Sequence, residues 1–355
     1  MKLIHCADLH LDSPMEANLS PEKARERKRE LLSAFSDLVR LASKNGVSAI
    51  LIAGDLFDSA HITKKAKSYV LETVASHPDL AFFYLVGNHD RGGLTAGGDP
   101  LPKNLYTFGD GWQSYPFGDV TITGSERPDA DTLTLSEHAL NIVLMHGQER
   151  AGKGSSSGED TIPLGKLKNK HIDYLALGHL HDYRTAPLDG RGIACYSGCL
   201  EGRGFDECGK KGYVLLEIEN KRVKHTFVPF AKRELHTVEC DVTGFTSQLD
   251  LENRLLDAVG NIPSHHLVKA VLTGSSPAEM PKDTEHLSQV LSDRFYFAKL
   301  RDASRTVIDP EVYQNDISLK GEFVRRVMAS NLNQAEKERV IACGFRALAG
   351  EEVDL

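Results

Sequence analysis

Five short apolar runs stand in the first half of the chain, and each is followed at once by side chains that can bind metals or move protons. The runs cover residues 3–6, 49–53, 82–86, 142–145 and 174–177. Apolar runs of this length predict buried strands. Because ligand sites in α/β proteins lie at the carboxyl ends of strands, we expect all five ends to meet at one edge of one sheet.

Two helices are predicted between these strands. Ser20 and Pro21 form a start signal, and apolar residues then recur at helical spacing until Asn45-Gly46 ends the pattern. Residues 63–76 have the same helical character. The first half of the longer helix carries a mixed charge run, for which we expect a solvated face in preference to a DNA contact. The basic residues considered for that contact are Arg25, Arg27, Lys28 and Arg29.

The second half of the chain changes character near residues 232–235. Before that point, runs at 192–196, 213–218 and 223–229 predict antiparallel strands that complete a second sheet. From residue 236 to residue 309, short strands alternate with helical pieces. This pattern predicts a small α+β domain that follows the first one.

The last part of the chain predicts two amphipathic helices. Phe323 and Val327 lie on one apolar stripe, Ile341 and Phe345 lie on the next, and residues 333–336 form an N-cap box for the second helix. Such stripes either dock on the protein's own surface or bind a partner. We expect that part of this surface binds another protein, because a short terminal segment can hardly bury both stripes.

Composition argues against several classes of protein. The net charge of −8 argues against indiscriminate coating of nucleic acid, so any DNA contact must be local. No apolar run approaches the ~20 residues of a membrane span, and no signal peptide precedes the first motif. Six cysteines in 355 residues are too few for a disulfide framework. We therefore expect a cytoplasmic protein without membrane contact.

Seven side chains at the strand ends form a predicted two-metal centre. We assign Asp8, His10 and His181 to a first metal position, Asn88, His146 and His179 to a second, and Asp55 as the bridge between them. Mixed imidazole, carboxylate and amide donors suit manganese, iron or zinc better than calcium. Two such ions about 3.5 to 4 Å apart would activate a shared water and hold phosphate oxygens during displacement at phosphorus.

Two further residues complete the predicted catalytic site. His89 directly follows Asn88, so its ring can reach a leaving-group oxygen, and we expect it to act as the general acid. Asp58 follows Asp55 within the same motif, and we expect its carboxylate to raise the pKa of His89. The alternative role for Asp58 is a cap at the start of a helix.

Two loops beside these motifs are rich in glycine and serine, at residues 92–98 and 147–158. We expect the first to form a rim of the site, since it lacks the Lys-Ser/Thr ending of a phosphate-binding loop. In the second loop, Arg150 and Lys153 are candidates for phosphate contacts. A surface loop without that role is the alternative.

The strand-end motifs, taken in order, resemble those of a known family. They read Asp8-Leu9-His10, Gly54-Asp55-Leu56-Phe57-Asp58, Gly87-Asn88-His89-Asp90, Met145-His146-Gly147 and Gly178-His179-Leu180-His181. They resemble the five motifs of calcineurin-like metallophosphoesterases, over residues 1–230. Residues 5–14, with Tyr196-Ser197-Gly198 and Phe205-Asp206-Glu207, look like those of SbcD-type DNA repair exonucleases, particularly their YhaO-like branch.

This resemblance implies a fold, an activity and partners. The fold would be a two-sheet metallophosphoesterase sandwich flanked by helices at residues 1–232, a small α+β capping domain at 233–312, and a C-terminal helical segment at 313–355. The activity would be manganese-dependent cleavage of DNA, as exonuclease or endonuclease, by a homodimer that binds an SbcC-like coiled-coil ATPase. The alternative is a phosphodiesterase or phosphatase for a small molecule or a phosphoprotein, because the same metal centre serves all of these reactions.

Overall fold

The computed structural model describes residues 1–15, 19–59, 62–91, 94, 100–149, 161–277, 280–307 and 312–348, without the side chain of Arg346. They belong to two compact units, Met1–Glu234 and Leu235–Leu355. Of the predicted loop at 92–98 only Leu94 is described, and Arg150 and Lys153 lie outside the described residues. Among the helices of the described part, none has the length and apolar character needed to cross a membrane.

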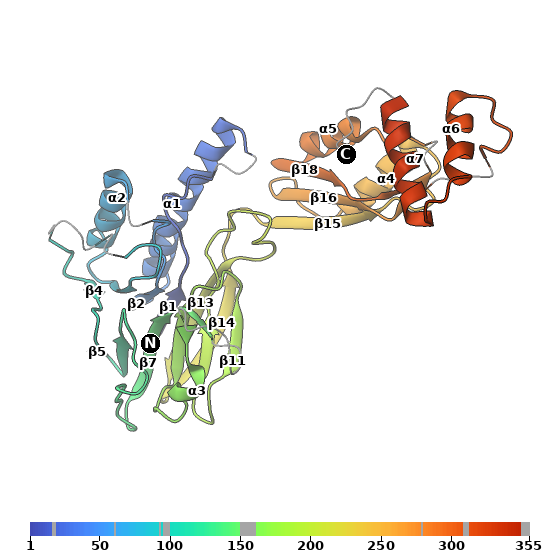
Figure 1. Ribbon diagram of the computed structural model, residues 1–355. Coiled ribbons are helices and arrows are strands. Elements are labelled where there is room, and N and C mark those ends of the chain that lie inside the picture. Colours follow the sequence, from blue (N-terminus) through green and yellow to red (C-terminus); the bar gives the residue numbers. More distant parts are fainter. Residues whose placement is uncertain are drawn as a thin grey trace. The chain divides into compact units, whose positions relative to one another are not determined.

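The first sheet of the first unit contains six strands (Figure 1). In spatial order they are β14 (Arg222–Pro229), β13 (Gly212–Glu219), β1 (Lys2–Cys6), β2 (Ala49–Ala53), β3 (Ala81–Leu85) and β4 (Leu105–Thr107). β1 to β4 run parallel to one another. β13 and β14 extend the sheet beyond β1 as an antiparallel hairpin.

The second sheet also contains six strands. In spatial order they are β11 (Arg184–Pro187), β12 (Ile193–Tyr196), β10 (Tyr174–Gly178), β7 (Leu140–His146), β6 (Val120–Gly124) and β5 (Gln113–Phe117). The four inner strands are parallel, and β5 and β11 are antiparallel edge strands. Three short elements lie between β7 and β10 in the chain: β8 (Gln148–Glu149), β9 (Thr161–Ile162) and α3 (Leu164–Leu167).

Two details of the predicted sheet arrangement are wrong. The five strand ends come from two sheets, because β7 and β10 pair with β6 and β12 and not with β1, β2 or β3. The predicted strands at 213–218 and 223–229 join the first sheet instead of completing the second. An apolar run specifies a strand but not the free edge with which that strand pairs. β13 pairs with the free edge of β1, a strand that lies much earlier in the chain.

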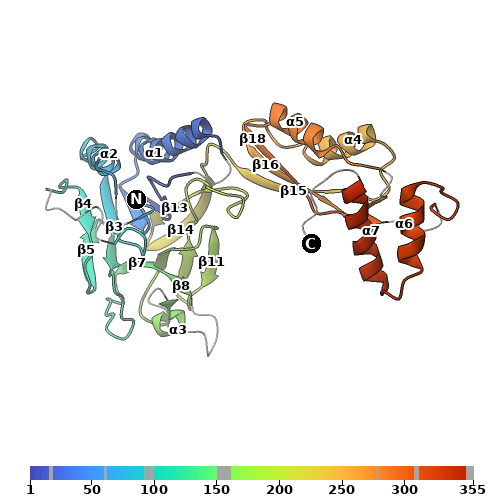
Figure 2. The same cartoon turned by 45° about the horizontal axis from the view of Figure 1, so that its top comes forward.

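Both predicted helices of this unit are confirmed. α1 (Pro21–Lys44) and α2 (Lys64–Ala75) lie side by side (Figure 2). The Ser20 side chain caps α1 by accepting a hydrogen bond from the backbone N–H of Lys23, and Thr63 caps α2 in the same way. These caps satisfy N–H groups that have no partner inside the helix.

Apolar side chains fill the layers between these elements. Because side chains alternate along a strand, each sheet buries two faces. One face of the first sheet packs against the helices through Ile50 and Phe82. The opposite face packs against the second sheet through Leu51 and Phe83. The two sheets therefore face each other and share one core, which fixes the carboxyl ends of their parallel strands relative to one another.

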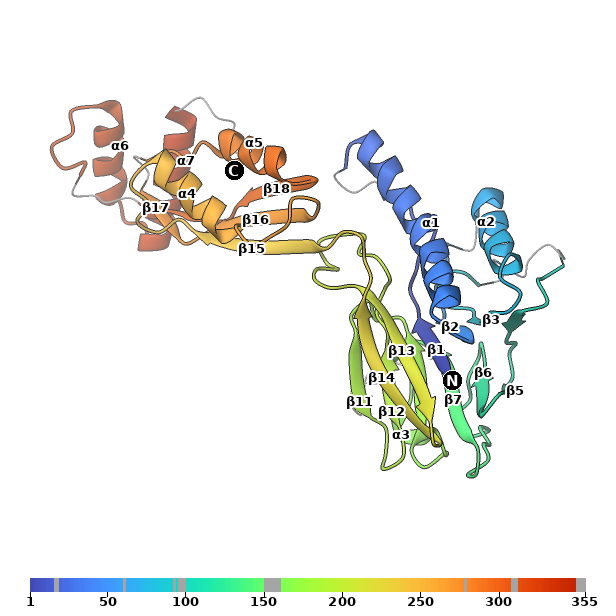
Figure 3. The same cartoon turned by 180° about the vertical axis from the view of Figure 1, so that it is seen from behind.

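The second unit begins with the pattern of strands and helices predicted for residues 236–309. In chain order its elements are β15 (Leu235–Asp241), α4 (Gln248–Ala258), β16 (Leu267–Thr273), β17 (Ser275–Pro277), α5 (Thr284–Arg294), β18 (Phe297–Asp302) and β19 (Arg305–Val307). β15, β16 and β18 form a parallel sheet, and α4 and α5 lie on one face of it (Figure 3). Two successive crossovers of the same hand place both helices on that face. The boundary at residue 312 stays a prediction.

The two predicted terminal helices are confirmed as α6 (Leu319–Met328) and α7 (Gln334–Leu348). The predicted N-cap box is present: the backbone N–H of Asn333 donates to Glu336 Oε2 (2.9 Å), and the backbone N–H of Glu336 donates to Asn333 Oδ1 (3.0 Å). This reciprocal pair fixes the start of α7.

The apolar stripes of these helices pack on one another. Val327, Ile341 and Phe345 are buried in one cluster with Tyr313, and Phe323 packs against it. The expectation that these stripes bind a partner is therefore wrong. Two antiparallel neighbours with facing stripes can bury each other, and a one-dimensional pattern does not reveal that.

The charge run of α1 is only in part the solvated face that the sequence predicts: Arg25 and Arg29 are exposed, but two other charged side chains are buried. Arg27 and Glu30 are 0% and 5% exposed. Arg27 Nη1 donates to Glu30 Oε2 (2.6 Å), and its Nη2 donates to the carbonyl oxygen of Gly202 (2.8 Å). The Nε of Arg233 also donates to Glu30 Oε1 (3.1 Å). This buried network ties α1 to two distant segments of the same unit.

Glu30 gives the first unit a testable dependence of stability on pH. Burial opposes ionisation, but hydrogen bonds from Arg233, Lys232 and Arg27 outweigh it and lower the pKa of Glu30 to about 2. Because the folded-state pKa lies below the unfolded one, this stabilisation is complete above about pH 5 and is lost as the pH falls towards 2. We expect Glu30→Gln to cost about 2 kcal/mol at pH 7 and less than about 1 kcal/mol at pH 3.

Urea unfolding followed by Trp112 fluorescence measures this effect, because the single tryptophan lies in the first unit. Asp37→Asn is the matched control, since Asp37 pairs with Arg40 on the same helix and both side chains are exposed (45% and 72%). We expect that control to change stability by less than about 0.5 kcal/mol at either pH. If Glu30→Gln lowered the free energy of unfolding equally at both pH values, the charge of Glu30 would not be the source of the stabilisation.

Candidate metal centre

The candidate site lies where the loops after β1, β2, β3, β7 and β10 meet. The backbone N–H of Asp8 donates to the carbonyl of Gly54 (3.1 Å), and that of His10 donates to the carbonyl of Asp55 (3.0 Å). These bonds continue the pairing of β1 and β2 beyond the sheet. His146 Nδ1, from the second sheet, lies 2.9 Å from the carbonyl oxygen of Ala53. The strand ends thus converge, although two sheets supply them.

Four of the seven predicted ligands have a left-handed backbone. Their φ values are 53° for Asp8, 44° for His10, 50° for Asp55 and 106° for His179. For side chains other than glycine such conformations cost about 1 to 3 kcal/mol each, and they concentrate at functional sites. The surrounding hydrogen bonds must hold these turns, and the turns aim their side chains at one point.

Two motif glycines leave the space that these side chains need. A Cβ atom on Gly54 would lie 2.1 Å from His146 Nδ1, and a Cβ atom on Gly87 would lie 2.0 Å from Asp55 Oδ1. Any larger residue would push a predicted ligand out of place. The glycines in these motifs therefore serve the close approach of ligands to backbone.

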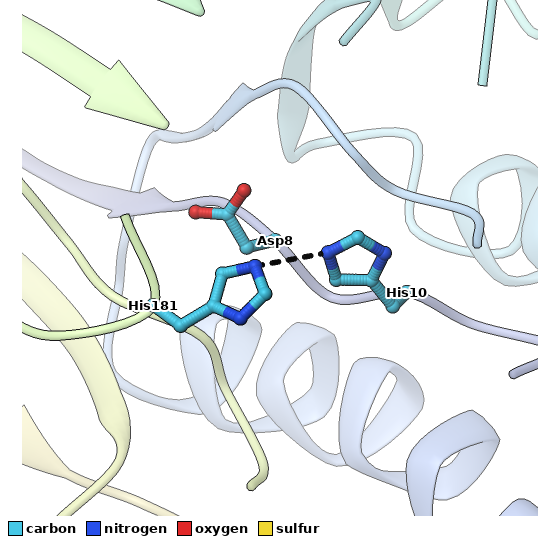
Figure 4. A group of neighbouring side chains, drawn as sticks. All are labelled: Asp8, His10 and His181. Carbon is cyan, nitrogen blue, oxygen red and sulfur yellow. Dashed lines mark hydrogen bonds between the residues drawn. The ribbon is translucent and has the colours of Figure 1, made fainter. Parts of the chain in front are cut away.

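The three predicted ligands of the first metal position lie together, although two sheets supply them. Asp8, His10 and His181 each offer one ligand atom within 4.8 Å of the others. The Nε2 atoms of His10 and His181 face each other at 3.2 Å, and the Asp8 carboxylate lies beside them (Figure 4). His10 follows β1 and His181 follows β10.

The second predicted position lies next to the first. His146 Nε2 is 2.8 Å from Asn88 Oδ1 and 3.4 Å from Asp55 Oδ2. The same Asp55 oxygen is 3.8 Å from His10 Nε2, so Asp55 faces both positions. The His179 ring lies 5.5 Å from the His146 ring. All seven predicted ligands are thus brought together.

The outer nitrogens of the histidines fix how the inner ones point. His181 Nδ1 lies 2.6 Å from Glu207 Oε1, and His10 Nδ1 lies 3.0 Å from Asp58 Oδ1. A carboxylate next to Nδ1 keeps the proton there and leaves the Nε2 lone pair free. Two neutral rings would then point lone pairs at each other across 3.2 Å. Either a shared proton or a divalent cation between them removes this repulsion, and the donor set fits such a cation.

Without a bound metal, two of the predicted ligands hold protons more strongly than usual. Burial raises the pKa of Asp8 to about 7. Burial lowers the pKa of His146, but its hydrogen bond to Asp55 and the charges of Asp55 and Asp8 outweigh that effect and raise it to about 9. Both groups must lose a proton before they can bind a cation, so metal affinity rises with pH between about 6 and 9.

His89 lies at the rim of the centre, but its predicted contact with Asp58 needs correction. His89 Nδ1 lies 3.2 Å from the backbone carbonyl oxygen of Asp58, and the ring is exposed. The Asp58 carboxylate contacts His10 and binds Arg203 Nη1 at 2.6 Å, while one of its oxygens also lies within 4.8 Å of a His89 ring nitrogen. The motif correctly placed these residues together but could not give the direction of the side chain.

Three residues without a predicted role support the site. The Asp90 carboxylate accepts hydrogen bonds from the backbone of Leu56 (2.9 Å) and Gly87 (2.8 Å), so it joins the loops after β2 and β3. Glu207 holds His181, and Arg203 binds Glu207. Asp90 and Glu207 stand within the family motifs, where they could have been noticed. No sequence pattern singles out Arg203.

Comparisons with known proteins agree with this arrangement. A family model described as calcineurin-like phosphoesterase matches residues 1–183. The chain is 26% identical over 310 residues to YhaO of Bacillus subtilis, described as an uncharacterized metallophosphoesterase, with 80% of this chain and 75% of that protein covered. It is 27% identical over 283 residues to the SbcD component of the nuclease SbcCD of Staphylococcus epidermidis, covering 68% and 73%. For the same component in Escherichia coli the identity is 23% over 412 residues, covering 99% of each.

The family match is long enough to be decisive. It spans 183 of 355 residues, which is more than half of the chain. It ends just beyond His181 and so includes every predicted ligand. All candidate ligands that converge at the ends of the two sheets therefore lie within the matched stretch. The chain belongs to the calcineurin-like phosphoesterase family.

Proposed function

We propose that this protein is a metal-dependent nuclease that hydrolyses phosphodiester bonds in DNA. The observation that supports metal dependence is the 3.2 Å distance between His10 Nε2 and His181 Nε2. The Nδ1 atom of each ring contacts a carboxylate. The similarity to the SbcCD nuclease components supports DNA as the substrate. The alternative reaction is hydrolysis of a small phosphodiester or a phosphoprotein, which the same donor set would support.

We assign the ligands as the sequence predicts. Asp8, His10 and His181 would hold one ion, Asn88, His146 and His179 the other, and Asp55 both. When bound, two divalent ions supply Lewis acidity towards phosphate oxygens and lower the pKa of a water molecule. We propose manganese for both positions, as the resemblance to SbcD-type nucleases implies; the mixed nitrogen and oxygen donors fit manganese, iron and zinc alike.

His89 is proposed as the general acid. Its Nδ1 lies against the carbonyl oxygen of Asp58 at 3.2 Å, which fixes the ring and leaves Nε2 for the proton that is transferred. The ring is exposed at the rim, where a leaving-group oxygen can approach it. In its charged form His89 can give this proton to the departing oxygen as the phosphorus–oxygen bond breaks.

The proposal includes partners and a location. We propose that the protein acts in DNA repair in the cytoplasm, as a homodimer with an SbcC-like ATPase, with residues 233–312 as a capping domain and residues 313–355 as the ATPase-binding segment. The buried stripes of α6 and α7 are not available for that contact. Ile317 and Leu319, which are 100% and 70% exposed, are better candidates for it.

The substrate class can be tested directly. We expect the manganese-loaded protein to release nucleotides or fragments from end-labelled DNA, and also to hydrolyse bis-p-nitrophenyl phosphate. Asp55→Asn serves as the control for contaminating nucleases, because it removes the residue that faces both positions. Hydrolysis of the small diester alone would favour the alternative function.

The ligand assignment predicts different metal contents for two variants. Asp55→Asn should lose both ions after dialysis, because Asp55 Oδ2 faces both positions. Asn88→Ala should lose mainly the second ion. Mass spectrometry of the metal content decides this, with Asp131→Asn as a surface control, since that carboxylate is 67% exposed. Two ions per chain in Asp55→Asn would rule out the bridge.

The role of His89 predicts a loss of rate without a loss of metal. His89→Asn should keep both ions, while kcat for DNA falls by about 10² to 10⁴. The rate for bis-p-nitrophenyl phosphate should fall much less, because nitrophenolate leaves without a proton. His138→Asn is the control, since that ring is 87% exposed. Loss of metal from His89→Asn, or equal slowing of both substrates, would show that His89 is not the acid.

A further inference from the structure

Arg203 occupies an unexpected place behind the first metal position. Its Nη1 lies 2.6 Å from Asp58 Oδ1, and its Nη2 donates to Glu207 Oε1 at 3.0 Å. These are the two carboxylates that face the outer nitrogens of His10 and His181. The side chain of Arg203 is 20% exposed. The guanidinium thus connects the supports of two candidate ligands that come from different sheets.

The contacts close into a ring of five side chains. From His10 the ring passes to Asp58 (3.0 Å), to Arg203 (2.6 Å), to Glu207 (3.0 Å) and to His181 (2.6 Å). It returns to His10 through the two Nε2 atoms at 3.2 Å. The gap between these two atoms is the candidate site of the first ion. Behind that gap, Arg203 connects the support of one histidine to the support of the other.

We propose that Arg203 is the positioning residue that holds both histidines of the first metal position, and only of that position. The inference rests on the proposed metal centre and adds a residue to it. Arg203 does not contact the ion or the substrate in this role. It holds Asp58 and Glu207 at a fixed separation, and each carboxylate then orients one imidazole.

The chemistry of arginine suits this task better than that of lysine. A guanidinium is planar and presents several N–H donors in a fixed fork, so one group can bind two carboxylates at once. Here the Nε of Arg203 also donates to Glu207 (3.3 Å), and so does its backbone N–H (2.7 Å). Its positive charge offsets the repulsion between the carboxylates of Asp58 and Glu207. A lysine would keep the charge but could not span both partners with the same geometry.

The ring does not extend to the second position. His146 is held by the carbonyl oxygen of Ala53 (2.9 Å), and Asn88 contacts His146 (2.8 Å). Asp55 accepts a hydrogen bond from the backbone N–H of His89 (3.0 Å). These three contacts hold the second position without passing through Arg203. Loss of the guanidinium should therefore affect one ion and spare the other.

Manganese binding to the full chain tests the proposal, with equilibrium dialysis and electron paramagnetic resonance to resolve the two ions. We expect Arg203→Met to weaken one ion by about 10- to 100-fold and to change the other by less than about 2-fold. Arg203→Lys should recover part of the lost affinity. His181→Ala identifies the first ion, and adding Arg203→Met to it should not weaken the remaining ion further, because both changes act on the same position.

Two variants separate this role from a general loss of stability. Arg191 also joins distant segments, since it binds Asp173 and the carbonyl oxygen of Ala139, but it lies before β12, at the opposite end of that strand from the site. Arg191→Met should lower the melting temperature without changing either manganese affinity. If Arg203→Met does not fold, Arg203→Lys, which keeps the positive charge, should fold and show a smaller weakening of the same ion alone.

The outcomes distinguish this inference from the proposed function. Wild-type affinity for both ions in Arg203→Met, or equal weakening of both ions, would overturn the role of Arg203 and leave the metal centre intact. Failure of the wild-type protein to bind manganese at all would overturn both. Selective weakening that Arg203→Lys partly restores would support the ring.

Discussion

The site depends on an electrostatic constraint: carboxylates and imidazoles that crowd into a few ångströms must be held so that their lone pairs converge. Side chains outside the ligand cluster hold the ligands in this arrangement. Asp58 and Glu207 contact the outer nitrogens of His10 and His181, and their own repulsion is offset by Arg203. The inner nitrogens are then left to a cation. Without such supports the rings would turn, and the cluster would be a destabilising concentration of charge.

The two-sheet packing makes this convergence possible. Parallel strands of both sheets end on the same side, and the shared core of Leu51 and Phe83 keeps those ends at a fixed separation. Hydrogen bonds between the loops, such as the one from Asp8 N–H to Gly54, continue the sheet into the site. They also hold the left-handed turns, whose conformational cost the packing of the whole unit must offset.

The buried charges elsewhere in the first unit follow the same physical rule. Arg27 and Arg233 both bind Glu30, and none of the three is left without an opposite charge. A buried ion pair of this kind contributes little net stability compared with an apolar cluster, but removing one partner leaves a costly charge. In the second unit, α6 and α7 are held together by apolar contacts instead of buried charges. They bury each other's apolar stripes through Val327 and Ile341.

The sequence by itself determined the strands that lead into the site, the long helices, the caps at Ser20 and Asn333, and the seven candidate ligands. Local information suffices for these features, since apolar periodicity, cap residues and motif order act over a few residues. Tertiary structure alone decided that two sheets supply the ligands, that β13 pairs with β1, and that Asp58 turns towards His10. It also decided that Arg27 is buried and that Arg203 stands between two carboxylates. Such contacts join residues far apart in the chain, and no local pattern records which side chains a fold will bring together.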